Sequence, residues 1–151
     1  DEFFNIGGAE SDVNTGVLES EHFVIGAGAR IDYMIGGGAH PFPSGAPVEE
    51  GFVQTPDICA FALEVLDARS GTWSRAFSAP GHNADNMSEE SWDASAFAGQ
   101  TARYRIYDTH DHGWGHIAVD HIRCSSCGPT ANAHAGWTRT SPGCVLGHNA
   151  R

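Results

Sequence analysis

The chain is a succession of short alternating segments separated by glycine and proline. Its 151 residues include 19 glycines and seven prolines, which fall between runs where apolar and polar side chains alternate as they do along a β-strand. No window has helical periodicity over more than two turns, although residues 88–97 can hold one short turn. Strands or strand pairs are expected at 15–25, 29–35, 58–67, 72–78, 102–108 and 115–124. About eight strands at this spacing predict an all-β fold, a jelly-roll β-sandwich.

Residues 58–67 form the clearest of these segments. Cys59, Phe61 and Leu63 share one face of the expected strand, and the opposite face is only slightly more polar, with Glu64 as its one charge. This pattern indicates a strand that is buried on both sides. The turn residues at 67–71 predict a β-hairpin across 58–78.

The length and an apolar content of 40% fit one compact domain with a core of its own. We assign residues 1–124 to the sandwich domain and 125–151 to a C-terminal extension, because the composition there changes to small and polar residues. Trp137 is the side chain of this extension that is best suited to pack on the sandwich.

The formal net charge is −11, and all eight basic residues are arginine. Such a surface repels phosphate backbones and anionic lipid, so partners are not expected to be nucleic acids or membranes. No apolar run reaches the roughly 18–20 residues of a membrane-spanning helix.

The cysteines form an even set, which favours two structural disulfides. We expect one bond from Cys144 to a member of the Cys124–Cys127 pair and one from Cys59 to the other member, which would pin the extension to the sandwich. Two alternatives remain open for the C-x-x-C motif: a redox function, or a zinc site with Cys144, His134 and His148.

Disulfides predict an oxidising compartment, and the sequon at Asn86 predicts glycosylation of a surface loop. The chain begins at Asp1 without methionine, which is typical of a secreted protein after removal of its signal peptide. We therefore expect an extracellular location.

The segment 108–123 contains four of the nine histidines. Strand alternation after residue 115 places His116 and Asp120 on one face and His121 on the other, so the four histidines cannot all converge on one ion. A transition-metal site made by His110, His112 and His116 remains possible. The alternative is that these histidines form hydrogen bonds that shape the loop.

A sugar-binding surface is the second possibility for this loop. An aromatic side chain covers the apolar face of a sugar ring while neighbouring polar groups bond its hydroxyls. Trp114 has suitable neighbours, and we predict a ligand-binding set of His110, Asp111, His112, Trp114 and His116. The alternative for Trp114 is a lid over the core.

Other motifs argue against phosphate binding and catalysis. The three glycines at 36–38 lack the lysine and following helix of a phosphate loop, so they predict a turn or a close approach of backbone. No nucleophile elbow, H-E-x-x-H or triad spacing is present, and we predict that the protein is not an enzyme.

Several fragments follow one family pattern in order. They are Asn14-Thr-Gly-Val-Leu-Glu-Ser20, Ile31-Asp-Tyr-Met-Ile-Gly-Gly-Gly38, Ser91-Trp-Asp93 and, as the most specific, Trp114-Gly-His-Ile-Ala-Val-Asp-His-Ile122. The sequence resembles the secreted β-sandwich accessory domains found beside glycoside hydrolase family 32 enzymes of the levanase and invertase type. The similarity extends from about Phe4 to Cys124, while residues 38–55 and the tail look like additions.

This resemblance implies a galactose-binding-like or jelly-roll fold with a non-catalytic, carbohydrate-associated role and often a structural calcium. Such modules supply calcium ligands from their first and last strands, which nominates Glu19, Glu21 and Asp120, with Asp12 in reserve. We therefore expect a carbohydrate-binding or adhesion module whose partner is a carbohydrate or glycoprotein. The alternative is a structural subunit of an extracellular filament or matrix that assembles through edge strands or the tail.

Overall fold

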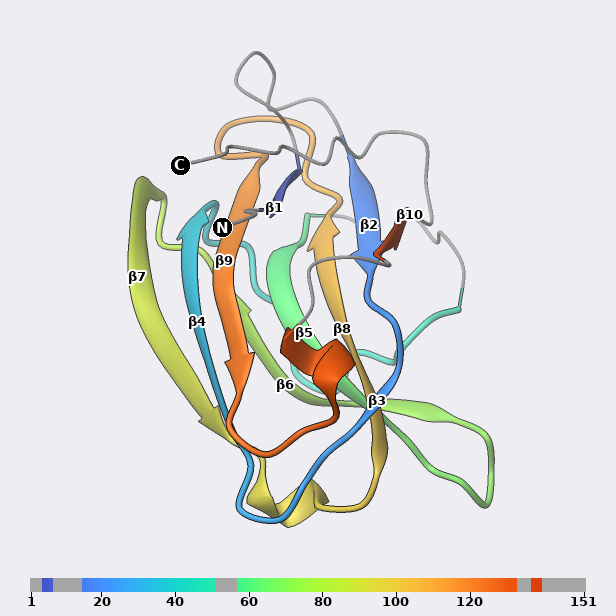
Figure 1. Ribbon diagram of the computed structural model, residues 1–151. Helices are drawn as coiled ribbons and strands as arrows, with labels where there is room; N and C mark the ends of the chain where they lie inside the picture. The colour runs from blue at the N-terminus through green and yellow to red at the C-terminus, as the bar shows by residue number, and fades with distance from the viewer. Residues whose placement is uncertain (1–3, 7–14, 51–56, 133–136, 140–151) are drawn as a thin grey trace.

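The protein is a sandwich of two antiparallel sheets, seen in a computed structural model that describes residues 4–6, 15–50, 57–132 and 137–139 (Figure 1). One sheet has the order β1-β9-β4-β7, and the other has the order β10-β2-β8-β5-β6 with β3 also paired to β8. The strands are β1 (Phe4–Ile6), β2 (Gly16–Glu19), β3 (Phe23–Val24), β4 (Arg30–Gly37), β5 (Cys59–Leu66), β6 (Trp73–Pro80), β7 (Ala84–Asp93), β8 (Thr101–Asp108), β9 (Ile117–Cys124) and β10 (Thr138–Arg139).

The strand order is that of a jelly roll. Both β2 and β3 pair with β8 and form one interrupted strand, so β1 to β9 make eight strands in chain order. The first, eighth, third and sixth form one sheet, and the second, seventh, fourth and fifth form the other. The predicted all-β jelly-roll sandwich is thus confirmed. No helix in the described part of the chain is long and apolar enough to cross a membrane.

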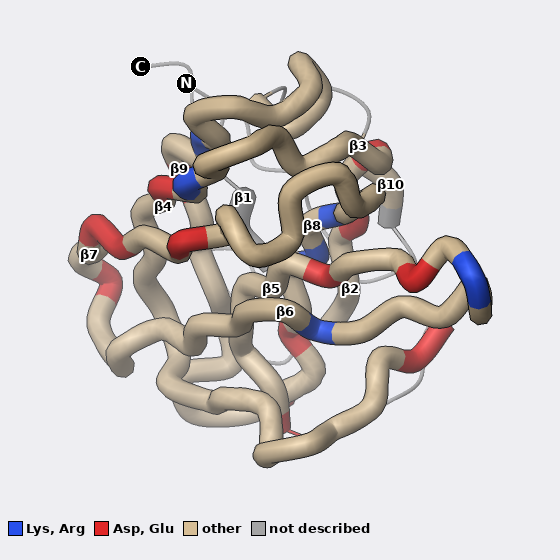
Figure 2. Tube along the Cα trace, turned by 90° about the horizontal axis from the view of Figure 1, so that it is seen from below, with Lys and Arg blue, Asp and Glu red and all other residues tan. Residues whose placement is uncertain are grey.

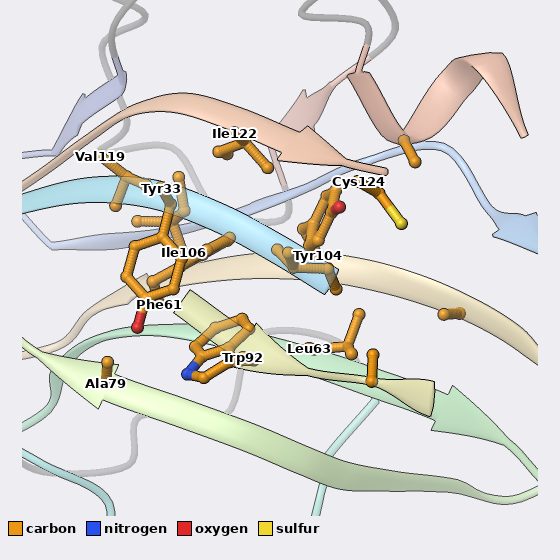
Figure 3. Close-up of a cluster of buried hydrophobic side chains, with 14 of the residues drawn as sticks. Tyr33, Phe61, Leu63, Ala79, Trp92, Tyr104, Ile106, Val119, Ile122 and Cys124 are labelled. Atoms are coloured by element: carbon orange, nitrogen blue, oxygen red, sulfur yellow. The ribbon is translucent and has the colours of Figure 1, made fainter. Parts of the chain in front are cut away.

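Aromatic side chains fill the centre of the sandwich (Figure 3). Phe61 on β5 stacks on Trp92 of β7 with ring centroids 5.0 Å apart, and Tyr33 on β4 lies 4.5 Å from Trp92. Phe61 and Tyr33 are almost completely buried. The predicted inward face of residues 58–67 is confirmed, since its apolar side chains belong to this core.

The strand β7 was not expected from the sequence. Its residues overlap the segment 88–97, for which one short turn is predicted, and the only helical turn there is a 3-10 helix at Ser95–Phe97. The reason is that β7 is an edge strand and most of its side chains are exposed. Little apolar alternation is therefore left in the sequence apart from Trp92.

The outer face of the six-stranded sheet carries a buried network of charged side chains. Arg103 on β8 donates from Nε to Glu64 Oε1 at 2.9 Å and from Nη1 to Glu19 Oε1 at 2.7 Å. Arg105 donates to the carbonyl of Glu49 at 2.9 Å, so residues of the 38–50 loop cover the network. Figure 2 shows the basic positions of β8 beside acidic positions of neighbouring strands. We call Arg103, Arg105, Glu19, Glu64 and Tyr107 the outer-face network.

The C-terminal extension is attached differently from the prediction. Cys124 and Cys127 form a disulfide with each other across the turn that follows β9, so the predicted bonds of this pair to Cys59 and Cys144 are wrong. The two residues are close enough in the chain for one turn to bring their Cα atoms within 5.5 Å. Cys59 is buried on β5 with Sγ 3.3 Å from Asp108 Oδ1.

Packing of the extension on the sandwich does occur, as predicted for Trp137. This side chain is 9% exposed and stacks on Tyr104, and β10 pairs with β2. Cys144, His134 and His148 lie outside the described residues, as does Asp12. Asn86 is exposed, but it lies on the edge strand β7 and not on a loop.

Candidate functional site

The histidine-rich loop lies at one end of the sandwich, between β8 and β9 at the top of Figure 1. Pairing of β5 with β8 sets Cys59 opposite Asp108. The pairing continues one step further, because Thr109 N–H donates to the carbonyl of Ile58 at 2.7 Å. Asp57 is thereby brought beside His110.

His110 is turned into the protein. It is 5% exposed, and its Nδ1 lies 3.0 Å from Asp57 Oδ1 while its Nε2 lies 3.1 Å from the carbonyl oxygen of Gly113. Its ring stacks on His40 with centroids 3.7 Å apart. Burial lowers the pKa of His40. These contacts favour a loop-shaping role for His110, and they leave little of it for a sugar to touch.

Trp114 is turned outward. It is 37% exposed, which is unusual here because Val24 is the other large apolar side chain exposed in the described ranges. Its backbone has a φ of 62°, a left-handed conformation that a tryptophan rarely adopts. The constraint points to a surrounding structure that determines the direction of the indole.

Two histidine–aspartate pairs involve residues of the loop that carries Trp114. His112 Nδ1 lies 2.8 Å from Asp111 Oδ1, and this hydrogen bond holds the pKa of Asp111 below its usual range. His116 Nε2 lies 3.0 Å from Asp85 Oδ1 of β7, and the centroid of the His116 ring is 5.6 Å from that of Trp114. We call these five residues the Trp114 platform: Asp85, Asp111, His112, Trp114 and His116.

Glycines at the end of β4 let the platform loop come close to the sheet. Gly38 N–H donates to the carbonyl of His116 at 2.8 Å, and Gly37 has a φ of 98°. A Cβ atom on Gly38 would collide with the carbonyl oxygen of Trp114. The predicted close approach at 36–38 is thus confirmed, although the segment ends a strand and does not form an isolated turn.

The three carboxylates nominated for calcium are not brought together. Glu19 lies on β2 and pairs with Arg103, whereas Asp120 lies on β9 in the opposite sheet. Each follows a core residue in its strand and points away from the core, so the sandwich separates them. Glu21 is exposed after β2. Calcium binding by this set remains a sequence-based prediction.

Asp120 instead contacts the residue that follows it. Its Oδ1 accepts the His121 N–H at 2.7 Å, and His121 has a φ of 52° at an irregularity in the pairing of β9 with β4. The irregularity returns Ile122 to the core. The prediction that alternation places His121 on the face opposite Asp120 is therefore wrong, because the bulge shifts the alternation by one residue and the two side chains lie together.

Three contributors to the site were missed by the sequence reasoning: His40, Asp57 and Asp85. They lie far from the loop in the chain and carry no motif. The signal that could have located Asp57 is the antiparallel pairing of 58–66 with 102–108, because it aligns the residues just beyond both strands.

A hollow in the described surface lies elsewhere. It has a volume of about 530 Å³ and lies between residues 42–48 and β6. Arg75 already stacks on Phe42 there, with its Cζ 3.5 Å from the ring centroid, and donates to the carbonyl of Ala46. Arg75 is therefore engaged in holding the 38–50 loop, and we favour the Trp114 platform as the contact surface.

The chain has partial similarity to a glycosyl hydrolase. A stretch of 62 residues, 41% of the chain, is 40% identical to a protein of Aspergillus rugulosus described as "Putative glycosyl hydrolase ecdE". The match spans 9% of that larger protein. No protein-family model matches the chain. Fold and comparison together define a β-sandwich domain with a region related to a glycosyl hydrolase.

Proposed function

We propose that the protein is a non-catalytic, extracellular carbohydrate-binding module and that the Trp114 platform contacts the sugar. The observation that carries the proposal is the exposed indole of Trp114, which has the Asp85–His116 pair beside it and the Asp111–His112 pair in the same loop. An exposed aromatic face with hydrogen-bonding groups at its edges matches a sugar ring, which has an apolar face and a rim of hydroxyls. The partial similarity to a glycosyl hydrolase supports the same class of ligand.

The acidic surface favours a neutral polysaccharide or glycoprotein glycan over an anionic one. The platform itself contains Asp85 and Asp111, both exposed, and the chain has a net charge of −11. A sulfated or uronic-acid polymer would be repelled by this field. The Cys124–Cys127 disulfide supports a location in an oxidising compartment.

A non-catalytic role is supported by how the buried carboxylates are used. Glu64 and Glu19 of the outer-face network both accept from Arg103, and residues of the 38–50 loop cover the network. Both are engaged in structural ion pairs, whereas hydrolysis of glycosides commonly needs two carboxyl groups on either side of the scissile bond.

Binding to a panel of neutral polysaccharides, measured by affinity electrophoresis and calorimetry, tests the proposal. Trp114→Ala should weaken binding at least tenfold, or about 1.4 kcal/mol, while the matched control Val24→Ala removes another exposed apolar side chain and should bind normally. Loss of the indole leaves the core intact, so circular dichroism should not change. Equal binding by both variants, or no binding of any polymer by the native protein, would contradict the proposal.

Assembly into filaments through edge strands is less favoured. The edge strand β7 carries Asp85, Glu89, Glu90 and Asp93, and Figure 2 shows acidic positions along it. Charges on an edge oppose pairing with a second copy. Sedimentation should therefore find a monomer that binds sugar, and a polymer without sugar affinity would favour the structural alternative.

A further inference from the structure

We infer that Asp57, His110 and His112 form a binding site for a divalent transition-metal ion such as Zn²⁺. This inference goes beyond the proposed function and does not depend on sugar binding. Among the described residues these three form the one group whose candidate ligand atoms all lie within 4.8 Å of one another. They come from two segments: Asp57 lies two residues before β5, and both histidines lie in the loop after β8.

The separations suit first-row metal bonds. Asp57 Oδ1 and His110 Nδ1 are 3.0 Å apart, and two ligands on bonds of about 2.1 Å at 90° to 109° are roughly 3.0–3.4 Å apart. These two atoms thus already have the spacing of neighbouring ligands on one ion. His112 has a side chain that is 70% exposed and can move the remaining distance without disturbing the core.

The other nitrogen of each histidine is oriented by an oxygen atom. His110 Nε2 lies 3.1 Å from the carbonyl of Gly113, which leaves Nδ1 for the metal. His112 Nδ1 lies 2.8 Å from Asp111 Oδ1, which leaves Nε2. Metal-binding histidines regularly donate their second N–H to a carboxylate or a backbone carbonyl. Both rings have this arrangement.

His110 has oxygen acceptors at both of its ring nitrogens. A neutral imidazole has one N–H and can donate to one of them, so a cation between Nδ1 and Asp57 Oδ1 completes the second contact. The stacked ring of His40 fixes the plane of His110 from one side. The position between these two atoms is therefore suited to a cation.

The donor set selects the kind of metal. Two imidazole nitrogens and one carboxylate suit Zn²⁺, Ni²⁺ or Cu²⁺, whereas Ca²⁺ needs six to eight oxygen ligands. The ion would join Asp57, just ahead of β5, to the β8–β9 loop and restrain the loop that carries Trp114. A second function follows: the metal site holds the shape of the Trp114 platform.

Calorimetry of the untagged full chain with Zn²⁺ after dialysis against a chelator tests the site, with Co²⁺ absorption as the spectroscopic readout of histidine ligation. We expect one equivalent of Zn²⁺ and a rise of the melting temperature by roughly 5–10 °C at a hundredfold excess over Kd. His112→Ala and Asp57→Asn change exposed side chains, so both variants should fold, and each should weaken Zn²⁺ binding at least roughly tenfold.

The matched control is His82→Ala, which removes an exposed histidine that also pairs with an acid, Glu90 at 3.0 Å, outside the site. It should bind Zn²⁺ as the native chain does. Three results would each overturn the inference. They are absence of Zn²⁺ binding, a Zn²⁺ affinity that is unchanged in His112→Ala and Asp57→Asn, and displacement of Zn²⁺ by equimolar Ca²⁺. Sugar affinity is measured separately, so its failure is distinguishable from failure of the metal site.

Discussion

Replacing Arg103 by methionine should strongly destabilise the protein. The Arg103 side chain is 3% exposed, and it donates to Glu64, which is 0% exposed, to Glu19 and to Glu50. Methionine keeps much of the volume but leaves the Glu64 carboxylate buried without its main partner. Removing one member of a buried ion pair typically costs about 3–5 kcal/mol.

Two neighbours of Glu64 reduce this cost. Arg105 Nη1 lies 3.7 Å from Glu64 Oε1, and the Tyr107 hydroxyl donates to the same carboxylate. We therefore expect a loss near the lower limit, about 3 kcal/mol, and a fall of the melting temperature by roughly 6–12 °C.

Urea denaturation of the native chain, Arg103→Met, Glu64→Leu and the double variant gives the assay. The double variant should be less destabilised than the sum of the single variants, because neither Arg103 nor Glu64 is left buried without the other. Arg30→Met is the control, since Arg30 is exposed and its partner Asp32 is too, and it should unfold like the native chain. A loss below about 1 kcal/mol for Arg103→Met, or full additivity in the double variant, would refute the reasoning.

Three further predictions concern the platform, the β2–β3 junction and the tyrosines. Gly38→Ala should push back the Trp114 carbonyl, destabilise the folded protein by about 1–3 kcal/mol and weaken sugar binding. In Gly113→Ala the added Cβ meets no atom within 4 Å, so this variant should unfold in urea like the native chain. Ser20→Ala removes the hydroxyl that accepts the Tyr104 N–H at 2.8 Å, and it should lower the free energy of unfolding by about 1–3 kcal/mol. Ser78→Ala, at an exposed serine, is the control. An equal loss in both variants would refute a stabilising role for the Ser20 hydroxyl. Burial raises the pKa of all three tyrosines. The neutral form of these side chains therefore contributes stability that is complete below about pH 10 and is lost as the pH rises above it. Phenolate absorbance should rise only together with unfolding, and reversible ionisation of the folded protein near the ordinary tyrosine pKa would contradict this.

Local alternation predicted much of the fold because most strands bury one face. Residues 58–67 are instead buried on both faces, and the sequence indicates this because apolar residues occupy the face of Phe61 and most of the face of Glu64. The edge strand β7 was missed because its side chains are mostly exposed and its pairing with β4 depends on backbone hydrogen bonds. Backbone pairing leaves little trace in side-chain pattern.

The site was predicted in part, and the missing half is non-local. The sequence identified Trp114 and its polar neighbours because they lie within one loop. It could not identify Asp57 or Asp85, which reach the loop through strand pairing and from β7. The bulge at His121 was missed for a different reason: a left-handed conformation at a histidine has no signature in one sequence.

The central claim is that Trp114 contacts the sugar, and the indole N–H resonances of the four tryptophans test it most directly. The indole N–H resonance of Trp114 is identified as the one that disappears in Trp114→Ala. A polysaccharide that the protein binds should shift this resonance in the ¹⁵N-labelled protein, while the resonances of buried Trp92 and Trp137 stay in place. A shift confined to Trp73, which lines the hollow beside β6, or no shift of the Trp114 resonance on binding, would contradict the account.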